Sequence, residues 1–183
     1  MAAEQTLTQL VDWKEFYGLE GAAAATLMGL LFVAVALNAD LILAKDRPQT
    51  KLRAEQAFQN YVAVLMISQI MLFPKLPNDI LSMFLLLEAS LMILYAAFRL
   101  FKSARNPEIG FGRAHHTRRL IPSFFAYGLI VSGAYNLLNH FEPAALFRVA
   151  FGTLLLLVTA TVTSWELLIR VAEIRHSLVK PHA

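Results

Sequence analysis

The chain has 183 residues, of which 57% are hydrophobic and 16% are charged. An ordinary soluble domain has about 45–50% apolar and about 25% charged residues, so this composition exceeds what a single soluble core can hide from water. There is no cysteine, which excludes disulfides, thiolate metal sites and cysteine nucleophiles. The net charge is +3, but the basic residues lie between apolar stretches, so we expect no nucleic-acid partner.

Five apolar runs fill most of the chain, and each is long enough to cross the roughly 30 Å hydrocarbon core as a helix. Continuous apolar runs lack the alternation of barrel strands, so helices are the spanning structure that satisfies the backbone. We therefore predict an all-α polytopic membrane helix bundle that forms a single integral membrane domain over residues 1–183. Pro122 is expected in the first turn of the fourth helix. The five predicted transmembrane helices cover about 21–44, 55–74, 79–101, 119–139 and 144–170.

The distribution of lysine and arginine predicts the orientation, because these residues concentrate on the cytoplasmic side of membrane proteins. Only Lys14, Lys75 and Arg148 of the 16 basic residues lie on one predicted face. The other face should be cytoplasmic, which places the N-terminus outside and the C-terminus in the cytoplasm. That face carries Lys45, Arg47, Lys51, Arg53, Arg99, Lys102, Arg105, Arg113, Arg118, Arg119, Arg170, Arg175 and Lys180.

The segment before the first span differs from a signal peptide, because residues 1–20 carry four acidic residues against the single Lys14. Trp13, Phe16 and Tyr17 are aromatic residues of the kind that settle at the membrane interface. We predict a short interfacial helix at the outer face, with a frayed tail as the alternative.

The first span is rich in small residues, with Gly21, Ala25 and Gly29 four residues apart. Small residues at this spacing let helices approach closely. They indicate packing within the bundle more strongly than they indicate an oligomer interface. The run GAAAATLMGLLFVAVALN, which follows the aromatic stretch WKEFY and ends at Asn38, resembles the opening of a group of small uncharacterised bacterial multi-spanning proteins. This resemblance covers the N-terminal quarter. It implies a bacterial inner (plasma) membrane location and no particular activity.

Glu88 is the clearest ionisable residue within an apolar run. It lies eight residues beyond Ile80, which is about 12 Å into the layer and close to the midplane. Ionisable groups in hydrocarbon are expensive and mark functional sites, and a lone carboxyl there stays neutral unless it is paired or wetted. Arg148 is the nearest candidate partner by depth. A structural pair with Arg148 and a proton-relay role for Glu88 both remain open.

The fifth predicted span carries a line of polar residues at helical spacing. Such a line can face a water-filled path or can face partner helices. Glu166 and Arg170 lie four residues apart near its inner end and fit a local ion pair. The line consists of Arg148, Gly152, Thr159, Thr163, Glu166 and Arg170.

Other polar residues gather at two depths. Asn38 and Asp40 end the first span near the level at which Gln59 opens the second, and Gln69 and Asn136 lie in the outer half. Each group can line a polar vestibule or pocket, or can form an interhelical hydrogen-bond cluster. The candidate buried polar or transport-path residues are Glu88, Arg148, Glu166, Thr159, Thr163, Gln59, Gln69, Asn136, Asn38 and Asp40.

Several kinds of chemistry lack their sequence signatures. All five histidines lie in predicted loops or the tail, whereas haem held between helices needs axial histidines at membrane depth. There is no phosphate-binding loop, no HExxH motif and no nucleophile elbow. We therefore expect no cofactor, no metal site and no catalytic residues, and a membrane enzyme acting on a lipid-facing substrate is the weakest alternative.

These observations favour a small multi-pass membrane protein that acts as a channel or transporter for protons or small ions, with Glu88 as the intramembrane carboxylate. The alternative is a non-catalytic accessory or regulatory subunit of another membrane complex, which would associate through the small-residue seams. The expected partners are the lipid bilayer and either further copies of the chain in a homo-oligomer or another membrane protein.

Overall fold

The computed structural model describes residues 2–44, 48–74, 76–105, 113–139 and 143–179, and helices account for nearly all of these residues. No strand occurs in these ranges. The six helices are α1 (Ala2–Leu37), α2 (Ala39–Ile42), α3 (Pro48–Leu72), α4 (Asn78–Arg105), α5 (Arg113–Asn139) and α6 (Pro143–Val179).

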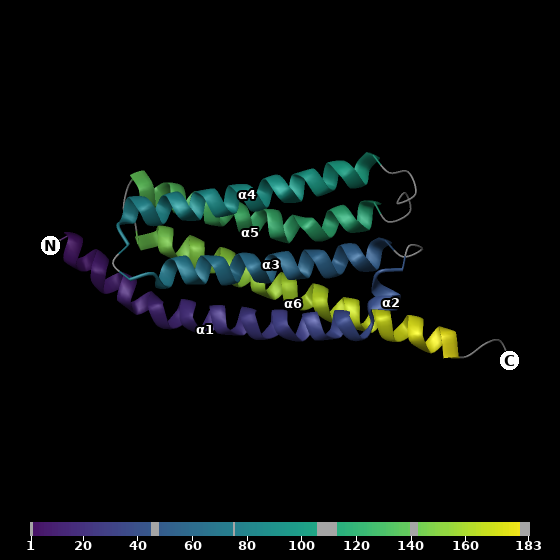
Figure 1. Cartoon of the computed structure of the whole chain (residues 1–183). Helices are drawn as coiled ribbons and strands as arrows, with labels where there is room; N and C mark the ends of the chain where they lie inside the picture. The colour runs from purple at the N-terminus through teal and green to yellow at the C-terminus, as the bar shows by residue number, and fades with distance from the viewer. Residues whose placement is uncertain (1, 45–47, 75, 106–112, 140–142, 180–183) are drawn as a thin grey trace.

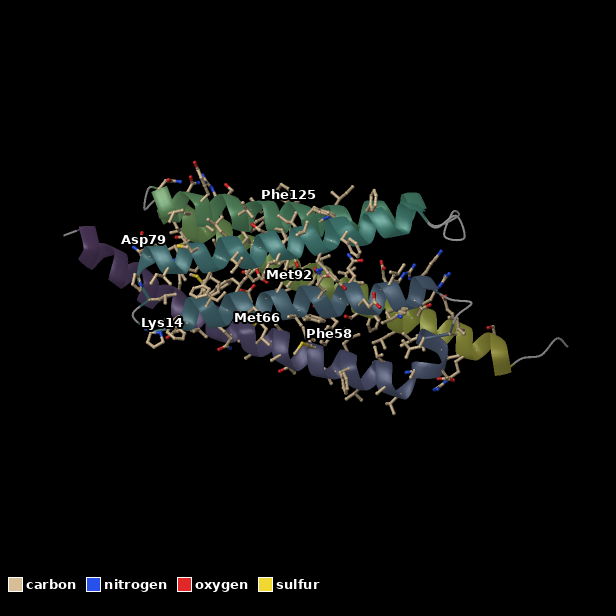
Figure 2. All side chains as sticks on the ribbon, turned by 45° about the horizontal axis from the view of Figure 1, so that its top comes forward. Lys14, Phe58, Met66, Asp79, Met92 and Phe125 are labelled. Atoms are coloured by element: carbon tan, nitrogen blue, oxygen red, sulfur yellow. The ribbon has the colours of Figure 1, made fainter. Side chains whose placement is uncertain are left out.

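The five long helices run side by side, and each of them runs opposite to the long helix that precedes it in the chain (Figure 1). The C-terminal ends of α1, α4 and α6 and the N-terminal ends of α3 and α5 therefore lie at one end of the bundle, which we call the basic end. Figure 2 shows Lys14 and Asp79 at the opposite end, with Met66 and Met92 nearer the middle.

Four of the long helices form a group in which each packs against two others: α3 on α4, α4 on α5, α5 on α6 and α6 on α3. α1 lies outside this group and packs mainly against α3, with a smaller contact to α6. The centre of the bundle is filled by large buried side chains from all four members of the group. These include Tyr61 and Ile67 of α3, Leu85 of α4, Tyr127 and Ile130 of α5, and Leu156 of α6.

Within the described residues, four helices are long and apolar enough to cross a membrane, which indicates a membrane protein, and the helices found there confirm the all-helical class. The four segments are Trp13–Leu37, Asn78–Phe98, Ile121–Asn139 and Ala144–Ser177.

The helix missing from this set is α3, which was predicted as the second span. Its first half is polar, because it carries Lys51, Arg53, Glu55 and several amide side chains. Gln56 and Asn60 are nevertheless buried, so α3 turns polar side chains toward its neighbours and not only toward the surroundings.

The beginning of the chain differs from the predicted separate interfacial helix, because α1 continues without a break from Ala2 to Leu37. The sequence before Gly21 has no proline to end a helix. Trp13 packs edge-on against Phe147 of α6 with ring centroids 4.9 Å apart, and also edge-on against Phe16 at 5.7 Å. Trp13 therefore fastens the start of the first candidate span to α6.

Several helix boundaries also differ from the prediction, since α3 begins at Pro48 and α6 continues to Val179. α1 ends at Leu37, seven residues earlier than expected, because the Asn38 side chain donates a hydrogen bond to the Ala34 carbonyl oxygen (2.8 Å) and the chain turns there into α2. α5 begins at Arg113, so Pro122 lies inside the helix and not in its first turn. The polar residues before the apolar run are therefore part of α5, which begins ahead of that run.

The seam between α5 and α6 depends on two glycines that bring the backbones together. A Cβ atom at Gly152 would lie 2.7 Å from Ile130 Cγ1 and 2.9 Å from the Ala126 carbonyl oxygen. A Cβ atom at Gly133 would lie 2.8 Å from the Ala145 carbonyl oxygen. Close approach at small residues is a main source of association between helices in lipid.

We expect Gly152→Ala to lower the free energy of unfolding by about 1–3 kcal/mol relative to Gly128→Ala, because the added methyl group overpacks the seam. Gly128 of α5 is the matched control. Apart from the nearby backbone of α5 itself, no described atom lies within 4 Å of a Cβ added at Gly128. Reversible unfolding of the purified protein in detergent measures the difference. Equal stability of the two variants would contradict a tight α5–α6 seam.

Candidate functional site

Glu88 lies on the face of α4 that packs into the bundle, together with the buried residues Leu81, Leu85 and Ala89. Only 8% of Glu88 is exposed, and neither of its carboxyl oxygens has a hydrogen-bond partner in the described part of the chain. It lies ten residues after Asn78 in a 28-residue helix, which is about 15 Å from the start of that helix. A carboxyl group is therefore enclosed near the middle of the bundle without a partner.

The structure does not bring Arg148 to Glu88. Arg148 is half-buried in the second turn of α6, near the end of the bundle opposite the basic end. The main neighbours of α4 are α5 and α3 rather than α6. Within the described residues, the predicted pair of Glu88 and Arg148 is not formed, and Glu88 remains a lone carboxyl.

A group of three buried polar residues links α3 and α5 across the interior. Asn60 donates a hydrogen bond from Nδ2 to Ser123 Oγ at 3.0 Å, and the Tyr127 hydroxyl donates to Asn60 Oδ1 at 3.4 Å. Tyr127 is also close enough to Glu88 for the two side chains to interact electrostatically. We call the hydrogen-bonded Asn60, Ser123 and Tyr127, together with the buried Glu88 of the neighbouring helix α4, the central polar cluster.

Tyr61, the next residue of α3, connects α3 to α6. The Tyr61 hydroxyl donates to Thr161 Oγ1 at 3.3 Å and lies 3.4 Å from Ser164 Oγ. Both partners also bond to carbonyl oxygens of α6 itself, at 2.8 Å and 2.9 Å. Because Asn60 and Tyr61 point to different neighbours, α3 provides the polar contacts to α5 and to α6 from a single turn.

A second enclosed carboxyl lies nearer the end opposite the basic end, where α1, α3 and α6 meet. Thr153 Oγ1 donates to Glu20 Oε2 at 2.8 Å, and only 4% of Glu20 is exposed. The other carboxyl oxygen, the Tyr17 hydroxyl and the Ser68 hydroxyl are buried without a hydrogen-bond partner among the described residues. We call Tyr17, Glu20, Ser68 and Thr153 the outer polar cluster.

The predicted polar line of α6 is not a set of free hydroxyl groups. Thr159 Oγ1 donates to the Leu155 carbonyl oxygen and Thr163 Oγ1 to the Thr159 carbonyl oxygen, each at 2.7 Å. Gly152 of the same line packs against α5 in the seam between α5 and α6. Glu166 is half-buried and Arg170 is exposed near the basic end.

The other predicted site residues lie apart from the central polar cluster or at its edge. Gln59 is half-buried and donates from Nε2 to Met92 Sδ at 3.5 Å. Gln69 and Asp40 are exposed, and Asn136 is half-buried. Asn38 bonds to its own helix. The structure therefore keeps Glu88 as a candidate site and surrounds it mostly with residues outside the predicted set.

Among the described residues, no group of three histidine, aspartate or glutamate side chains is placed to hold a metal ion. The polar chemistry of the bundle consists instead of carboxyl, hydroxyl and amide groups. Comparisons with protein-family models, with curated proteins and with solved structures found no match for this chain. Its function has to be inferred from these groups alone.

We expect the bond between Asn60 and Tyr127 to give a measurable coupling energy. A double-mutant cycle with Asn60→Ala and Tyr127→Phe should give about 0.6 kcal/mol and at most about 1.7 kcal/mol, the range found for hydrogen bonds between membrane helices. The control cycle pairs Asn60→Ala with Tyr61→Phe, because Tyr61 bonds to α6 and not to Asn60. Equal coupling in both cycles would contradict the assigned bond.

Thr153→Val should destabilise the protein by about 1–3 kcal/mol more than Thr163→Val, because it leaves both oxygens of the buried Glu20 without a partner. Thr163 is a matched control, since it is buried on the same helix and bonds only to its own helix backbone. Unfolding in detergent at neutral pH compares the two variants. A larger loss for Thr163→Val would contradict a structural tie between Glu20 and Thr153.

Proposed function

We propose that this chain is a small transport protein that moves protons or small cations across a membrane, with Glu88 as the group that binds and releases them. The observation that supports this proposal is the enclosed carboxyl of Glu88, whose two oxygens lack a partner in the described residues. An unpaired charge in such a place is costly. A bound proton or cation would remove that cost, and its release would restore it.

The proposal includes a fifth crossing by α3, with the N-terminus outside, the C-terminus in the cytoplasm and the chain in a bacterial inner membrane. α3 has 25 residues, enough to cross about 30 Å of hydrocarbon. Its buried amides are surrounded by more apolar helices, which is how polar residues are tolerated at membrane depth. The helix ends at the basic end carry most of the lysine and arginine residues, as expected on the cytoplasmic side.

The polar groups of the bundle lie at successive depths, and these would be steps of the path. Ser68 of the outer polar cluster lies eight residues after Asn60 on α3, about 12 Å along the helix axis. Tyr61 and its two hydroxyl partners on α6 lie beside Asn60. A proton entering at Glu20 would reach Glu88 through hydroxyl groups and water, in the manner of carboxyl relays in transporters.

Proton flux into liposomes that contain the purified protein tests the proposal. Glu88→Gln keeps the shape of the side chain but cannot exchange a proton, so we expect flux to fall at least about tenfold, roughly a 1.4 kcal/mol change in barrier. Glu173→Gln makes the same chemical change at an exposed site of α6 and should leave the flux unchanged. Vesicles that stay tight with folded wild-type protein would end the proposal.

A second candidate function is that of an accessory subunit, and two open glycines favour it. Gly29 of α1 and Gly128 of α5 are exposed, with no described atom near the position of an added Cβ beyond each helix's own nearby backbone. Glycine on an exposed helix face allows close approach of another membrane helix. Co-purification of a larger membrane complex that is lost in Gly128→Ile would support this role, and a homogeneous assembly of this chain alone would count against it.

A further inference from the structure

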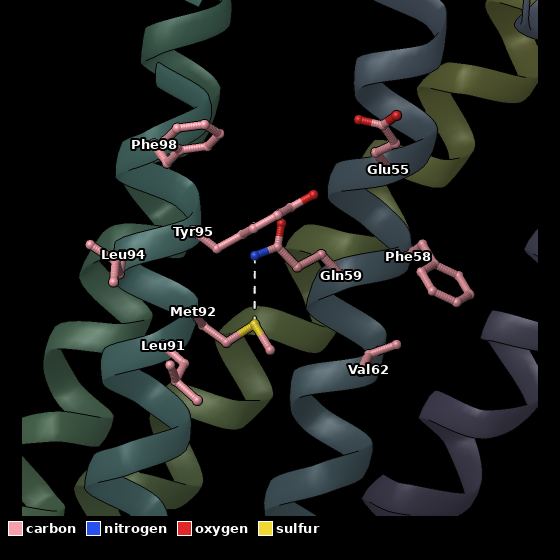
Figure 3. A pocket seen from close by; sticks show the side chains of 9 residues that line it. All are labelled: Glu55, Phe58, Gln59, Val62, Leu91, Met92, Leu94, Tyr95 and Phe98. Atoms are coloured by element: carbon pink, nitrogen blue, oxygen red, sulfur yellow. Dashed lines mark hydrogen bonds between the residues drawn. The ribbon is translucent and has the colours of Figure 1, made fainter. Parts of the chain in front are cut away.

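A groove of about 780 Å³ opens between α3 and α4 (Figure 3). Its volume lies within the range of about 300–1,000 Å³ that is typical of small-molecule sites. The residues that line it span two turns on each helix, which corresponds to a length of about 10 Å. They are Glu55, Phe58, Gln59 and Val62 of α3, and Leu91, Met92, Leu94, Tyr95 and Phe98 of α4.

The groove changes in polarity along its length. The lining is mostly apolar, and Glu55, its one charged residue, lies toward the basic end together with Phe98, whereas Val62 and Leu91 lie nearer the middle of the bundle (Figure 3). The flanking side chains are exposed apolar residues, such as Leu94 and Phe98. A ligand that matches this gradient has a polar group at the basic end and an apolar chain that extends toward the middle of the bundle.

The amide of Gln59 indicates that the groove suits a ligand with a hydrogen-bond acceptor. Figure 3 shows Gln59 and Tyr95 extending toward one another, with Gln59 Nε2 bonded to Met92 Sδ at 3.5 Å. A thioether sulfur is a weak acceptor. An oxygen of a bound molecule would be a better partner for this amide, and Met92 is flexible enough to move aside.

The mouth of the groove carries two opposite charges. Lys51 Nζ lies 3.9 Å from Glu55 Oε1, and the two side chains are 57% and 41% exposed. An exposed pair at this distance contributes little to stability, and both charges are accessible to charged groups on a ligand. A headgroup with a phosphate and an ammonium complements both charges.

We propose that this groove binds one acyl chain of a phospholipid whose headgroup contains a phosphate and a primary ammonium. Lys51 would bind the phosphate and Glu55 the ammonium, which offers three donors where a quaternary ammonium offers none. The chain would lie along Val62, Leu91 and Met92. This inference does not depend on ion transport, because the groove is lined by residues other than Glu88 and the headgroup would be held by Lys51 and Glu55.

A second membrane helix is the competing occupant, and the dimensions favour the lipid. A helix with its side chains is about 10–12 Å wide, and a helix laid along α3 and α4 would need a seam longer than two turns. The groove wall also lacks glycine, the residue that close helix packing in lipid favours. A single flexible chain fits a short, apolar and open-sided groove.

Native mass spectrometry of the full-length protein tests the proposal, after delipidation and incubation with equal amounts of ethanolamine, choline and glycerol phospholipids that share the same acyl chains. Leu91→Trp should fill the groove and retain one phospholipid fewer than wild type. Leu87→Trp is the matched control, because Leu87 lies one turn away on α4, outside the groove lining, with 57% exposure against 54% for Leu91. We expect wild type to retain the ethanolamine lipid about tenfold over the choline lipid.

Several outcomes would overturn the inference. Equal lipid retention by Leu91→Trp and Leu87→Trp would exclude the groove as the site, provided that both variants unfold at the wild-type temperature. Val62→Trp, with Met66→Trp as its control, repeats the comparison from the α3 wall if Leu91→Trp fails to fold. Preference for the glycerol lipid, or no loss of headgroup preference in the double variant Lys51→Gln, Glu55→Gln, would refute the assigned headgroup. A polypeptide retained in place of the lipid would identify the competing occupant.

Discussion

The architecture depends on enclosing a polar helix among apolar ones. α3 carries amide and hydroxyl side chains that are costly to leave in hydrocarbon, and α1, α4 and α6 pack around it. Asn60 and Tyr61 then reach α5 and α6 with hydrogen bonds. Individual bonds between membrane helices are modest, but an unpaired amide inside the bundle would be costly. The polar side chains of α3 therefore determine which helices surround it and at what register.

The same enclosure explains why the two buried carboxyl groups differ. Glu20 lies where three helices converge, and a threonine of α6 provides one hydrogen bond. Glu88 lies on a helix whose neighbours offer it Tyr127 at electrostatic range but no hydrogen bond within the described residues. The one hydrogen bond of Glu20 strengthens a helix contact, whereas Glu88, which has none among the described residues, stores a cost that binding can relieve. This contrast makes Glu88, and not Glu20, the stronger candidate for exchange.

The sequence was sufficient to identify the five long helices and the buried carboxyl of Glu88, because an isolated carboxyl inside a leucine-rich run is visible without knowledge of packing. The partners of α3 were not predictable in the same way. Asn60 and Ser123 are 63 residues apart, and their contact depends on α5 lying diagonally across from α3. The suggested pair of Glu88 and Arg148 failed for the same reason, since it was based on depth alone and the order of the helices around the bundle was unknown. The sequence prediction missed Glu20 because the acidic residues near it placed it in the segment before the first span. Tyr17, Glu20 and Ala24 nevertheless follow the spacing of a buried helix face.

The hydroxyl groups of α6 have a mechanical consequence. Thr159, Thr161, Thr163 and Ser164 all donate to carbonyl oxygens one turn earlier in their own helix. Sharing carbonyl oxygens in this way weakens the regular backbone ladder and commonly bends helices. Over residues 155–164, beyond the glycine seam with α5, the backbone ladder of α6 is therefore weaker than in a helix without such bonds.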